Sequence, residues 1–187
     1  RPITTSVSIG LAFAGDTAAS ETVLRDADIA MVRAKEAGGG RIEVFDDVLR
    51  QRVTKRLNTE QELRRALRNN ELRLLYQPIV SLSEGMVAAE ALVRWHHPTR
   101  GVLGPGEFID VADETGLILG LGDWVLAEGC RTLRSWRDAL GDAAPNLTVN
   151  LSMRQIIEPS FVSRVRLHLV ESGIDPSNLI MEITEDS

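Results

Sequence analysis

The chain has 187 residues and 43% hydrophobic content, enough for one ordinary domain or for parts of two around a packed core. Its formal net charge of -6 argues against a general DNA-, RNA- or anionic-membrane-binding protein, although a local basic groove for a small phosphate ligand is compatible with it. The single cysteine excludes an intrachain disulfide and a thiolate metal site, which suits a reducing cytoplasm. No apolar run approaches the length of about 20 residues that spans a bilayer, so we expect no membrane contact by this segment.

The first elements form a short strand, helix, strand unit. Residues 6–13 are typical of a strand, a helix is expected from Ser20 until the glycines at 38–40 end it, and residues 41–45 indicate a second strand. This number of residues is too small to bury a core alone. We therefore interpret residues 1–46 as the end of a larger α/β domain. The chain also starts at Arg1 rather than at a methionine, and we expect it to be cut from a longer protein.

A charged, arginine-rich helical pattern follows. Leucine and valine residues recur at helical spacing between Asp46 and Asn70, and the remaining positions are mostly polar. Because no aromatic residues interleave the basic ones, a solvated helix is favoured over a nucleic-acid surface. We therefore predict a helical linker over residues 47–70.

From residue 71 onward strands alternate with helices. We expect strands at residues 72–80, 86–95, up to 150 and 179–184, and helices at 108–112, 123–140 and 160–171. Alternation of this kind predicts a mostly parallel sheet with helices outside it. The first pair must be the exception, because the connection between residues 80 and 86 is far shorter than the dozen or so residues of a parallel crossover.

Three oxygen donors lie in or at the end of apolar strands of this region. Glu90 interrupts the run Ala89 to Trp95, Asn150 ends a second strand, and Glu182 lies in the last. The carboxyl ends of parallel strands meet at one edge, and carboxylate and amide oxygens are what a hard divalent cation binds. The apolar run predicts that the Glu90 carboxylate is buried. For Glu90 alone, a buried ion pair with Arg94 on the same strand face is an equally good interpretation, and the two other donors favour the metal.

The neighbouring histidines are a weaker signal. His96 and His97 are adjacent on a strand and so point to opposite faces, which prevents them from chelating one ion together. A packing or turn role is the favoured interpretation. Trp124 and Trp136 likewise fit packing of a helix against the sheet better than stacking on a nucleotide base.

An ordered series of motifs makes the segment from about residue 63 to the end resemble the EAL domain, the cyclic di-GMP phosphodiesterase domain of bacterial signalling. The matching residues are Tyr76-Gln77-Pro78-Ile79, Glu90-Ala91-Leu92-Val93-Arg94-Trp95, His97-Pro98, Gly101, Pro105, Phe108-Ile109, Ala112, Glu114-Thr115-Gly116, Val149-Asn150-Leu151-Ser152 and Glu182-Ile183-Thr184-Glu185. Their order and spacing over more than a hundred residues make the resemblance specific, whereas a bare Glu-Ala-Leu tripeptide would carry almost no information.

The resemblance implies a fold and a set of roles. The fold would be a partial TIM-like (β/α)8 barrel with an antiparallel first strand. Catalytic Mg2+ or Mn2+ in a two-metal site would be held by Glu90, Asn150 and Glu182, and Glu185 would support a loop beside the metals. The phosphodiester and guanine side of cyclic di-GMP would contact a further set of residues, Gln77, Leu92 and Arg94.

Residues 1–46 resemble the end of a GGDEF domain, the diguanylate cyclase module that often precedes an EAL domain. The resemblance rests on a short set of motifs, Ser8-Ile9-Gly10, Ala27-Asp28-Ile29-Ala30-Met31, Ala34-Lys35, Gly38 and Arg41. The chain departs from the usual pattern at Val32, where Tyr is common, and at Gly39-Gly40, where Arg-Asn is common.

Two functions follow from these resemblances. The first is metal-dependent hydrolysis of cyclic di-GMP to linear pGpG by an intact cytoplasmic protein, which we expect to be a homodimer. Residues 71–187 would be the N-terminal half of its EAL domain. Because the family's paired Asp-Asp, Lys and further Glu come later than Ser187, we expect the chain alone to be inactive. The alternative is a non-catalytic module that binds cyclic di-GMP as a sensor.

Overall fold

The structure is a computed structural model that describes residues 5–14, 19–83 and 85–183. Its contacts divide the chain into two compact units, Arg1–Asn58 and Thr59–Ser187. No helix within the described ranges is both long enough and apolar enough to cross a membrane.

The first unit is a two-stranded parallel sheet packed against a helix. It contains, in chain order, β1 (Ile9–Ala12), α1 (Ser20–Glu36) and β2 (Ile42–Phe45), followed by the start of α2 (Asp47–Ala66). Ala30 and Ala34 of α1 are fully buried, and their small side chains let the helix approach the sheet closely. At Gly10 the approach is so close that a Cβ would overlap the backbone of α1. The two predicted strands and the helix are thus present, with β1 shorter than expected.

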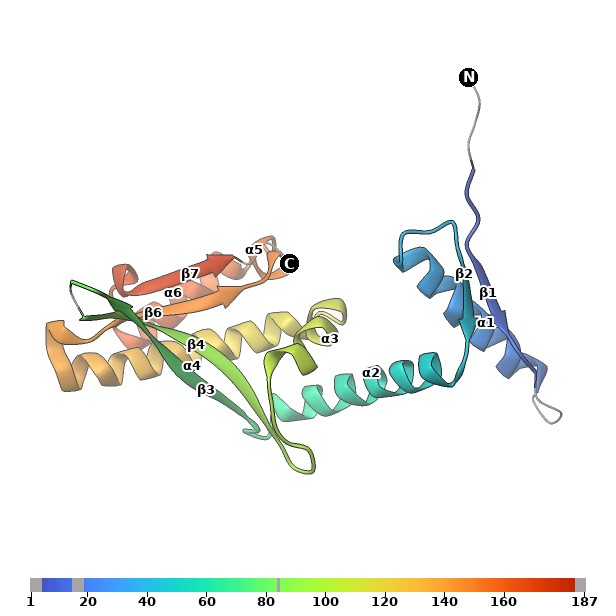
Figure 1. Cartoon of the computed structure of the whole chain (residues 1–187). Helices are drawn as coiled ribbons and strands as arrows, with labels where there is room; N and C mark the ends of the chain where they lie inside the picture. Colours follow the sequence, from blue (N-terminus) through green and yellow to red (C-terminus); the bar gives the residue numbers. More distant parts are fainter. Residues whose placement is uncertain (1–4, 15–18, 84, 184–187) are drawn as a thin grey trace, which may run out of the picture. The chain divides into compact units, whose positions relative to one another are not determined.

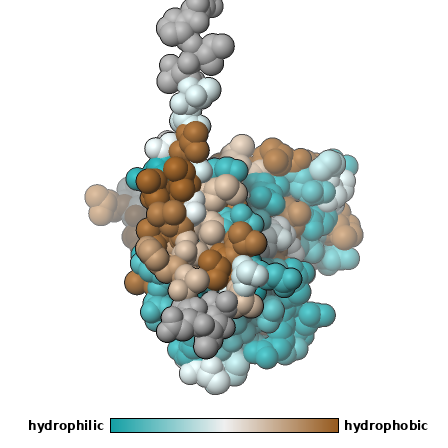
Figure 2. Space-filling view, turned by 90° about the vertical axis from the view of Figure 1, so that its right-hand side faces the viewer, coloured by the Kyte–Doolittle hydropathy of each residue, from teal (hydrophilic) through white to brown (hydrophobic). Residues whose placement is uncertain are grey.

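The face of this small sheet turned away from α1 is apolar and exposed. Ile9 and Leu11 of β1 are in register with Ile42 and Val44 of β2, and all four side chains are at least 40% exposed. Figure 2 shows hydrophobic side chains gathered over this part of the molecule. A contiguous exposed apolar patch usually marks a surface that contacts another molecule. This sheet face is therefore typical of one that packs against further protein.

Helix α2 belongs to both units. In the first unit Arg50 lies 3.7 Å from the buried Asp26 carboxylate, and the Asp46 side chain accepts a hydrogen bond from Leu49 N–H at 2.8 Å near the helix start. In the second unit Leu63 and Ala66 are completely buried in the core. The division at residue 58 falls inside the helix. The C-terminal half of the predicted linker is therefore a packed element of the second unit.

The second unit is a five-stranded mixed sheet with helices on one face (Figure 1). After α2 it contains β3 (Leu72–Ser81), β4 (Gly85–His97), β5 (Gly101–Leu103), α3 (Ile109–Glu114), α4 (Leu117–Leu140), β6 (Asn146–Leu151), α5 (Met153–Ile156), α6 (Phe161–Ser172) and β7 (Leu179–Ile183). The strand order is β3-β4-β6-β7, with β5 paired to β4.

The pairing of the strands follows the expectation from connection lengths. β3 and β4 are antiparallel, whereas β4 with β6 and β6 with β7 are parallel. The short strand β5, which the sequence pattern did not indicate, turns back along the end of β4 after Gly101 adopts a positive φ of 74°. Helix α4 begins earlier than expected, immediately after the left-handed Gly116. The sheet is open, so the unit is a partial barrel.

The core lies between the sheet and helices α4 and α6, which run side by side (Figure 1). Leu147 and Val149 of β6 are 0% exposed, and they pack with Leu126 and Leu133 of α4 and Val165 of α6. Since side chains alternate along a strand, the residues between them must point to the opposite face. That opposite face is the one that carries the predicted site residues.

We expect Leu147→Ala to lower the free energy of unfolding of the second unit by about 2–5 kcal/mol, because it leaves a cavity between β6 and α4. Leu82→Ala is the matched control. The side chain of Leu82 is fully exposed, and its removal should change stability by less than about 0.5 kcal/mol. Urea unfolding followed by tryptophan fluorescence measures both, since every tryptophan lies in the second unit. Equal stability of the two variants would contradict this description of the core.

Candidate functional site

Glu90 and Asn150 are in direct contact. Glu90 lies in the middle of β4 and Asn150 near the C-terminal end of the parallel strand β6. The side-chain amide of Asn150 donates a hydrogen bond from Nδ2 to Oε1 of Glu90 at 2.7 Å. Glu90 is half-buried and Asn150 is exposed, so the carboxylate remains open to solvent rather than enclosed in the core as the apolar run around it suggested.

Glu182 continues this arrangement on the next strand. It lies in β7, is exposed, and is in register with Asn150 in a parallel pair. Residues in register in a parallel pair point to the same face of the sheet, on strands about 4.8 Å apart. The three predicted oxygen donors therefore share one face. Glu185, the fourth predicted residue near the metals, lies outside the described residues.

The three predicted ligand-binding residues lie on the same face. Gln77 of β3 is the register partner of Glu90, and Leu92 and Arg94 follow Glu90 at the even spacing that keeps side chains on one side of a strand. Gln77 is exposed, whereas Leu92 and Arg94 are half-buried.

Arg94 does not form the ion pair with Glu90 that the sequence left open. Its Nη1 donates to the backbone carbonyl of Val93 at 2.8 Å. Among the described residues neither Glu90 nor Arg94 takes part in a salt bridge; Glu90 pairs with Asn150 instead. The guanidinium group thus keeps most of its donors for another partner.

The neighbour of Gln77 fixes the orientation of β3. Tyr76 points to the helix side, where its ring packs edge-on against Trp136 of α4 at 4.9 Å. Burial raises the pKa of the Tyr76 phenol, so the hydroxyl stays protonated at neutral pH and donates to Thr132 Oγ1 at 2.8 Å. With Tyr76 held on α4, alternation along the strand places Gln77 on the site face. The packing role predicted for Trp136 is confirmed.

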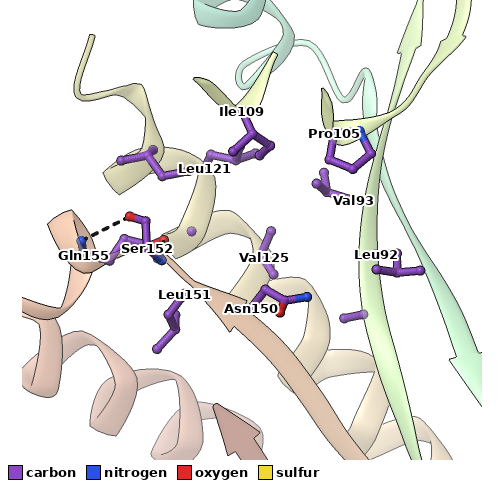
Figure 3. A pocket seen from close by; sticks show the side chains of 13 residues that line it. Leu92, Val93, Pro105, Ile109, Leu121, Val125, Asn150, Leu151, Ser152 and Gln155 are labelled. Atoms are coloured by element: carbon purple, nitrogen blue, oxygen red, sulfur yellow. Dashed lines mark hydrogen bonds between the residues drawn. The ribbon is translucent and has the colours of Figure 1, made fainter. Parts of the chain in front are cut away.

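An apolar pocket of about 260 Å³ lies beside Asn150 (Figure 3). Two residues of the site face, Leu92 and Asn150, belong to its lining. The other lining residues come from β4, β6 and the segments around α3, α4 and α5: Ala91, Val93, Pro105, Ile109, Ile118, Leu121, Gly122, Val125, Leu151, Ser152 and Gln155. The wall is therefore mostly aliphatic, with few polar groups, as is usual for pockets that hold small organic ligands.

The polar edge of the pocket has a local signal in the sequence that our sequence analysis missed. Ser152 begins helix α5 with a capping box: its hydroxyl accepts from Gln155 N–H at 3.4 Å, and the Gln155 side chain accepts from Ser152 N–H at 3.1 Å. The pattern Ser-x-x-Gln directly after a strand predicts such a helix start. The chain is thereby turned sharply just after Asn150.

The three oxygen donors differ from a metal site built only of acidic, histidine or cysteine side chains. Within the described ranges no group of at least three His, Cys, Asp or Glu side chains is arranged to hold a metal. The predicted set consists of two carboxylates and one amide. It is therefore not a group of this kind, because asparagine is not one of these four residue types. Its chemistry still fits a hard cation, because Glu90, Asn150 and Glu182 offer only oxygen ligands on one sheet face.

Comparison with known proteins places the second unit in a family. Residues 60–187 match the model of the EAL domain. The protein named "Bifunctional diguanylate cyclase/cyclic di-GMP phosphodiesterase MucR" from Pseudomonas aeruginosa is 40% identical over 184 residues, which are 97% of this chain and 27% of that protein. "Cyclic di-GMP phosphodiesterase PdeR" from Escherichia coli is 36% identical over 182 residues, covering 97% of this chain and 27% of that protein. The chain thus spans about a quarter of the length of these relatives.

Solved structures agree with the sequence matches. The structure titled "PaMucR Phosphodiesterase, c-di-GMP complex" superposes with a TM-score of 0.65 and 44% identity, over 68% of this chain and 52% of that one. The FimX EAL domain from Pseudomonas aeruginosa, described as bound to c-di-GMP, gives a TM-score of 0.61 and 27% identity, over 69% of this chain and 51% of that one. The likeness of residues 1–46 to the end of a GGDEF domain stays a prediction. The family match, the open mixed sheet and the ordered motifs together show that this chain belongs to the EAL domain family.

Proposed function

We propose that the chain supplies the metal-binding and ligand-binding face of a cyclic di-GMP phosphodiesterase. The observation that carries the proposal is the common sheet face of Glu90, Asn150 and Glu182, with a contact of 2.7 Å between the first two. It is supported by relatives whose names include cyclic di-GMP phosphodiesterase and which match 97% of this chain.

In this proposal Glu90, Asn150 and Glu182 would hold Mg2+ or Mn2+. Asn150 now directs its amide nitrogen at Glu90, and a rotation of the amide by half a turn would present its oxygen in the same place. When bound, such a cation would activate water for attack on a phosphodiester bond, whose cleavage converts cyclic di-GMP to linear pGpG. We propose that Glu185 supports a loop beside the metals.

Arg94, Gln77 and Leu92 would contact the nucleotide. An arginine side chain grips a phosphate through two parallel hydrogen bonds, and the donors of Arg94 are largely unused. Leu92 stands at the boundary between the site face and the aliphatic pocket, so a flat base could lie against it while the phosphate reaches Arg94. The register of Gln77 with Glu90 would bring its amide to the opposite side of the same ligand.

We further propose that residues 1–46 are the end of a GGDEF domain, since the match to MucR extends over 97% of this chain. The second compact unit starts at residue 59 and the family match at 60, which supports a linker that is shorter than residues 47–70. In this proposal the protein acts in the cytoplasm as a homodimer.

A second candidate is a module that binds cyclic di-GMP without cleaving it. It is favoured by the small number of carboxylates on the site face. Among the acidic residues predicted there, Glu90 and Glu182 lie within the described residues. The likeness to the FimX EAL domain, whose structure is titled as a cyclic di-GMP complex, is compatible with it.

Glu90→Gln is expected to lower kcat/KM for cyclic di-GMP hydrolysis in Mg2+ by at least about 100-fold, because an amide replaces a charged metal ligand. Release of pGpG from the full-length protein, followed by chromatography, measures the effect. Glu171→Gln, on the exposed surface of α6, is the control and should leave the rate unchanged. If the unchanged protein binds the nucleotide but does not cleave it in Mg2+ or Mn2+, the second candidate replaces the first.

Arg94→Ala should weaken cyclic di-GMP binding by about 10- to 100-fold, because hydrogen bonds to a charged phosphate are worth about 1.5–3 kcal/mol. Arg94→Lys keeps the charge but loses the planar pair of donors, so it should restore only part of the affinity. Calorimetric titration in EDTA separates binding from cleavage. Arg134→Ala removes a surface arginine that pairs with Asp138, and it serves as the control. Equal affinities for the Arg94→Ala and Arg134→Ala proteins would remove Arg94 from the site.

A further inference from the structure

His97 is a buried histidine at the end of the strand that carries Arg94. Its side chain is 2% exposed, although it is the last residue of β4. The ring packs edge-on against Trp95 at 5.1 Å, and Trp95 in turn meets Phe108 at 5.6 Å. His96, its neighbour, is exposed, as expected for adjacent residues on a strand. The predicted packing role of His97 is therefore confirmed, and its two ring nitrogens remain to be explained.

The hydrogen bonds of the ring define where its proton lies. Nδ1 accepts the backbone N–H groups of Thr99 and Arg100 at 3.2 and 3.1 Å. A ring nitrogen that accepts hydrogen bonds carries no hydrogen, so the neutral ring must carry its own on Nε2. His97 thus fixes the turn between β4 and β5 with one nitrogen and holds a donor on the other.

The Nε2 side of the ring faces helix α2. Nε2 lies 3.2 Å from Oε2 of Glu62, a polar contact without the alignment of a hydrogen bond, and this buried nitrogen makes no hydrogen bond within the part of the chain that the structure describes. Glu62 is held in turn by Arg100 Nη2 at 3.0 Å, and the Arg100 guanidinium covers the Trp95 ring at 5.4 Å. A buried donor with no acceptor near it costs about 1–3 kcal/mol, so the nearby Glu62 carboxylate lowers the cost of burying this N–H group.

Helix α2 forms part of the support of the ligand pocket. One core cluster contains Leu63 and Ala66, which follow Glu62 by one and four residues, together with Trp95, Ile118 and Leu121. Ile118 and Leu121 also line the pocket beside Asn150. The half of α2 that Glu62 belongs to therefore packs behind both the pocket wall and the Arg94 end of β4.

We propose that the contact between His97 and Glu62 is a latch that seats helix α2 on the second unit and thereby positions Arg94 and the pocket wall for the ligand. His97 and Glu62 act as positioning residues and touch no ligand. The seating of α2 stands on the geometry alone, whereas its effect on affinity rests on the proposed binding of cyclic di-GMP. A change in the seating of α2 would then alter affinity without altering any residue of the site.

The two amide residues that can replace histidine separate this role from that of the turn. His97→Asn keeps an acceptor near the position of Nδ1 but cannot reach Glu62, whereas His97→Gln keeps a donor near Nε2 and loses the turn acceptor. Glu62→Ala removes the partner. Glu60→Ala is the matched control, since its carboxylate lies on the same helix and pairs with Arg64 at 3.0 Å on the surface.

Two measurements on the full-length protein decide the proposal: hydrogen exchange of residues 59–66 without ligand, and the Kd for cyclic di-GMP in EDTA. Glu62→Ala and His97→Asn should each speed exchange and raise the Kd about tenfold, with the double variant no weaker than either. His97→Gln should stay within about threefold of the unchanged protein, and Glu60→Ala should match it.

Two results would overturn the latch: unchanged exchange in Glu62→Ala, or greater damage from His97→Gln than from His97→Asn, which would assign His97 to the turn alone. Faster exchange with an unchanged Kd would refute the positioning of the ligand site. If the unchanged protein does not bind cyclic di-GMP, the proposed function fails, while the exchange data still decide the latch. Should His97→Asn fail to fold, Glu62→Ala carries the test, because that side chain is 32% exposed.

Discussion

The parallel register of β4, β6 and β7 is the constraint on which the candidate site depends. Asn150 meets Glu90 and stands level with Glu182 only because the three strands are aligned as they are. A slip by one residue in β6 would turn Asn150 to the helix side and bring Val149 to the site face. A site assembled from single residues on separate strands is therefore only as well defined as the pairing that holds those strands.

That pairing is set by the core rather than by the site. Leu147, Val149 and Leu151 of β6 are buried against α4 and α6, and each buried side chain of this size contributes about 1.5–3 kcal/mol. The hydrogen bond between Asn150 and Glu90 adds about 0.5–1.5 kcal/mol on an open face. Apolar alternation therefore decides which face each residue takes, and the polar residues occupy the positions that this leaves. The site residues are free to serve ligand binding because stability depends far more on the core than on them.

This division explains what the sequence could and could not predict. The rule that carboxyl ends of parallel strands meet at one edge predicted that Glu90, Asn150 and Glu182 come together, and the short connection before β4 predicted the antiparallel pair, because both are consequences of chain geometry. The burial of Glu90 was overestimated, since its apolar neighbours pack on the other face. The pocket lining from the segments around α3 and α4 and the packing of the C-terminal half of α2 in the second unit depend on long-range contacts that no local pattern encodes.

The partners of the two kinds of polar residue distinguish support from function. The ring of His97 is buried and both of its nitrogens face other protein groups, so a change there acts on the neighbouring elements. Glu90 differs, because a carboxylate can accept about four hydrogen bonds and the one recorded for this side chain comes from Asn150. Its remaining lone pairs face a half-exposed side of the sheet, on which Glu182 of β7 provides a second carboxylate. Spare acceptor capacity of this kind, held in place by a register that the core determines, is what a hard cation requires.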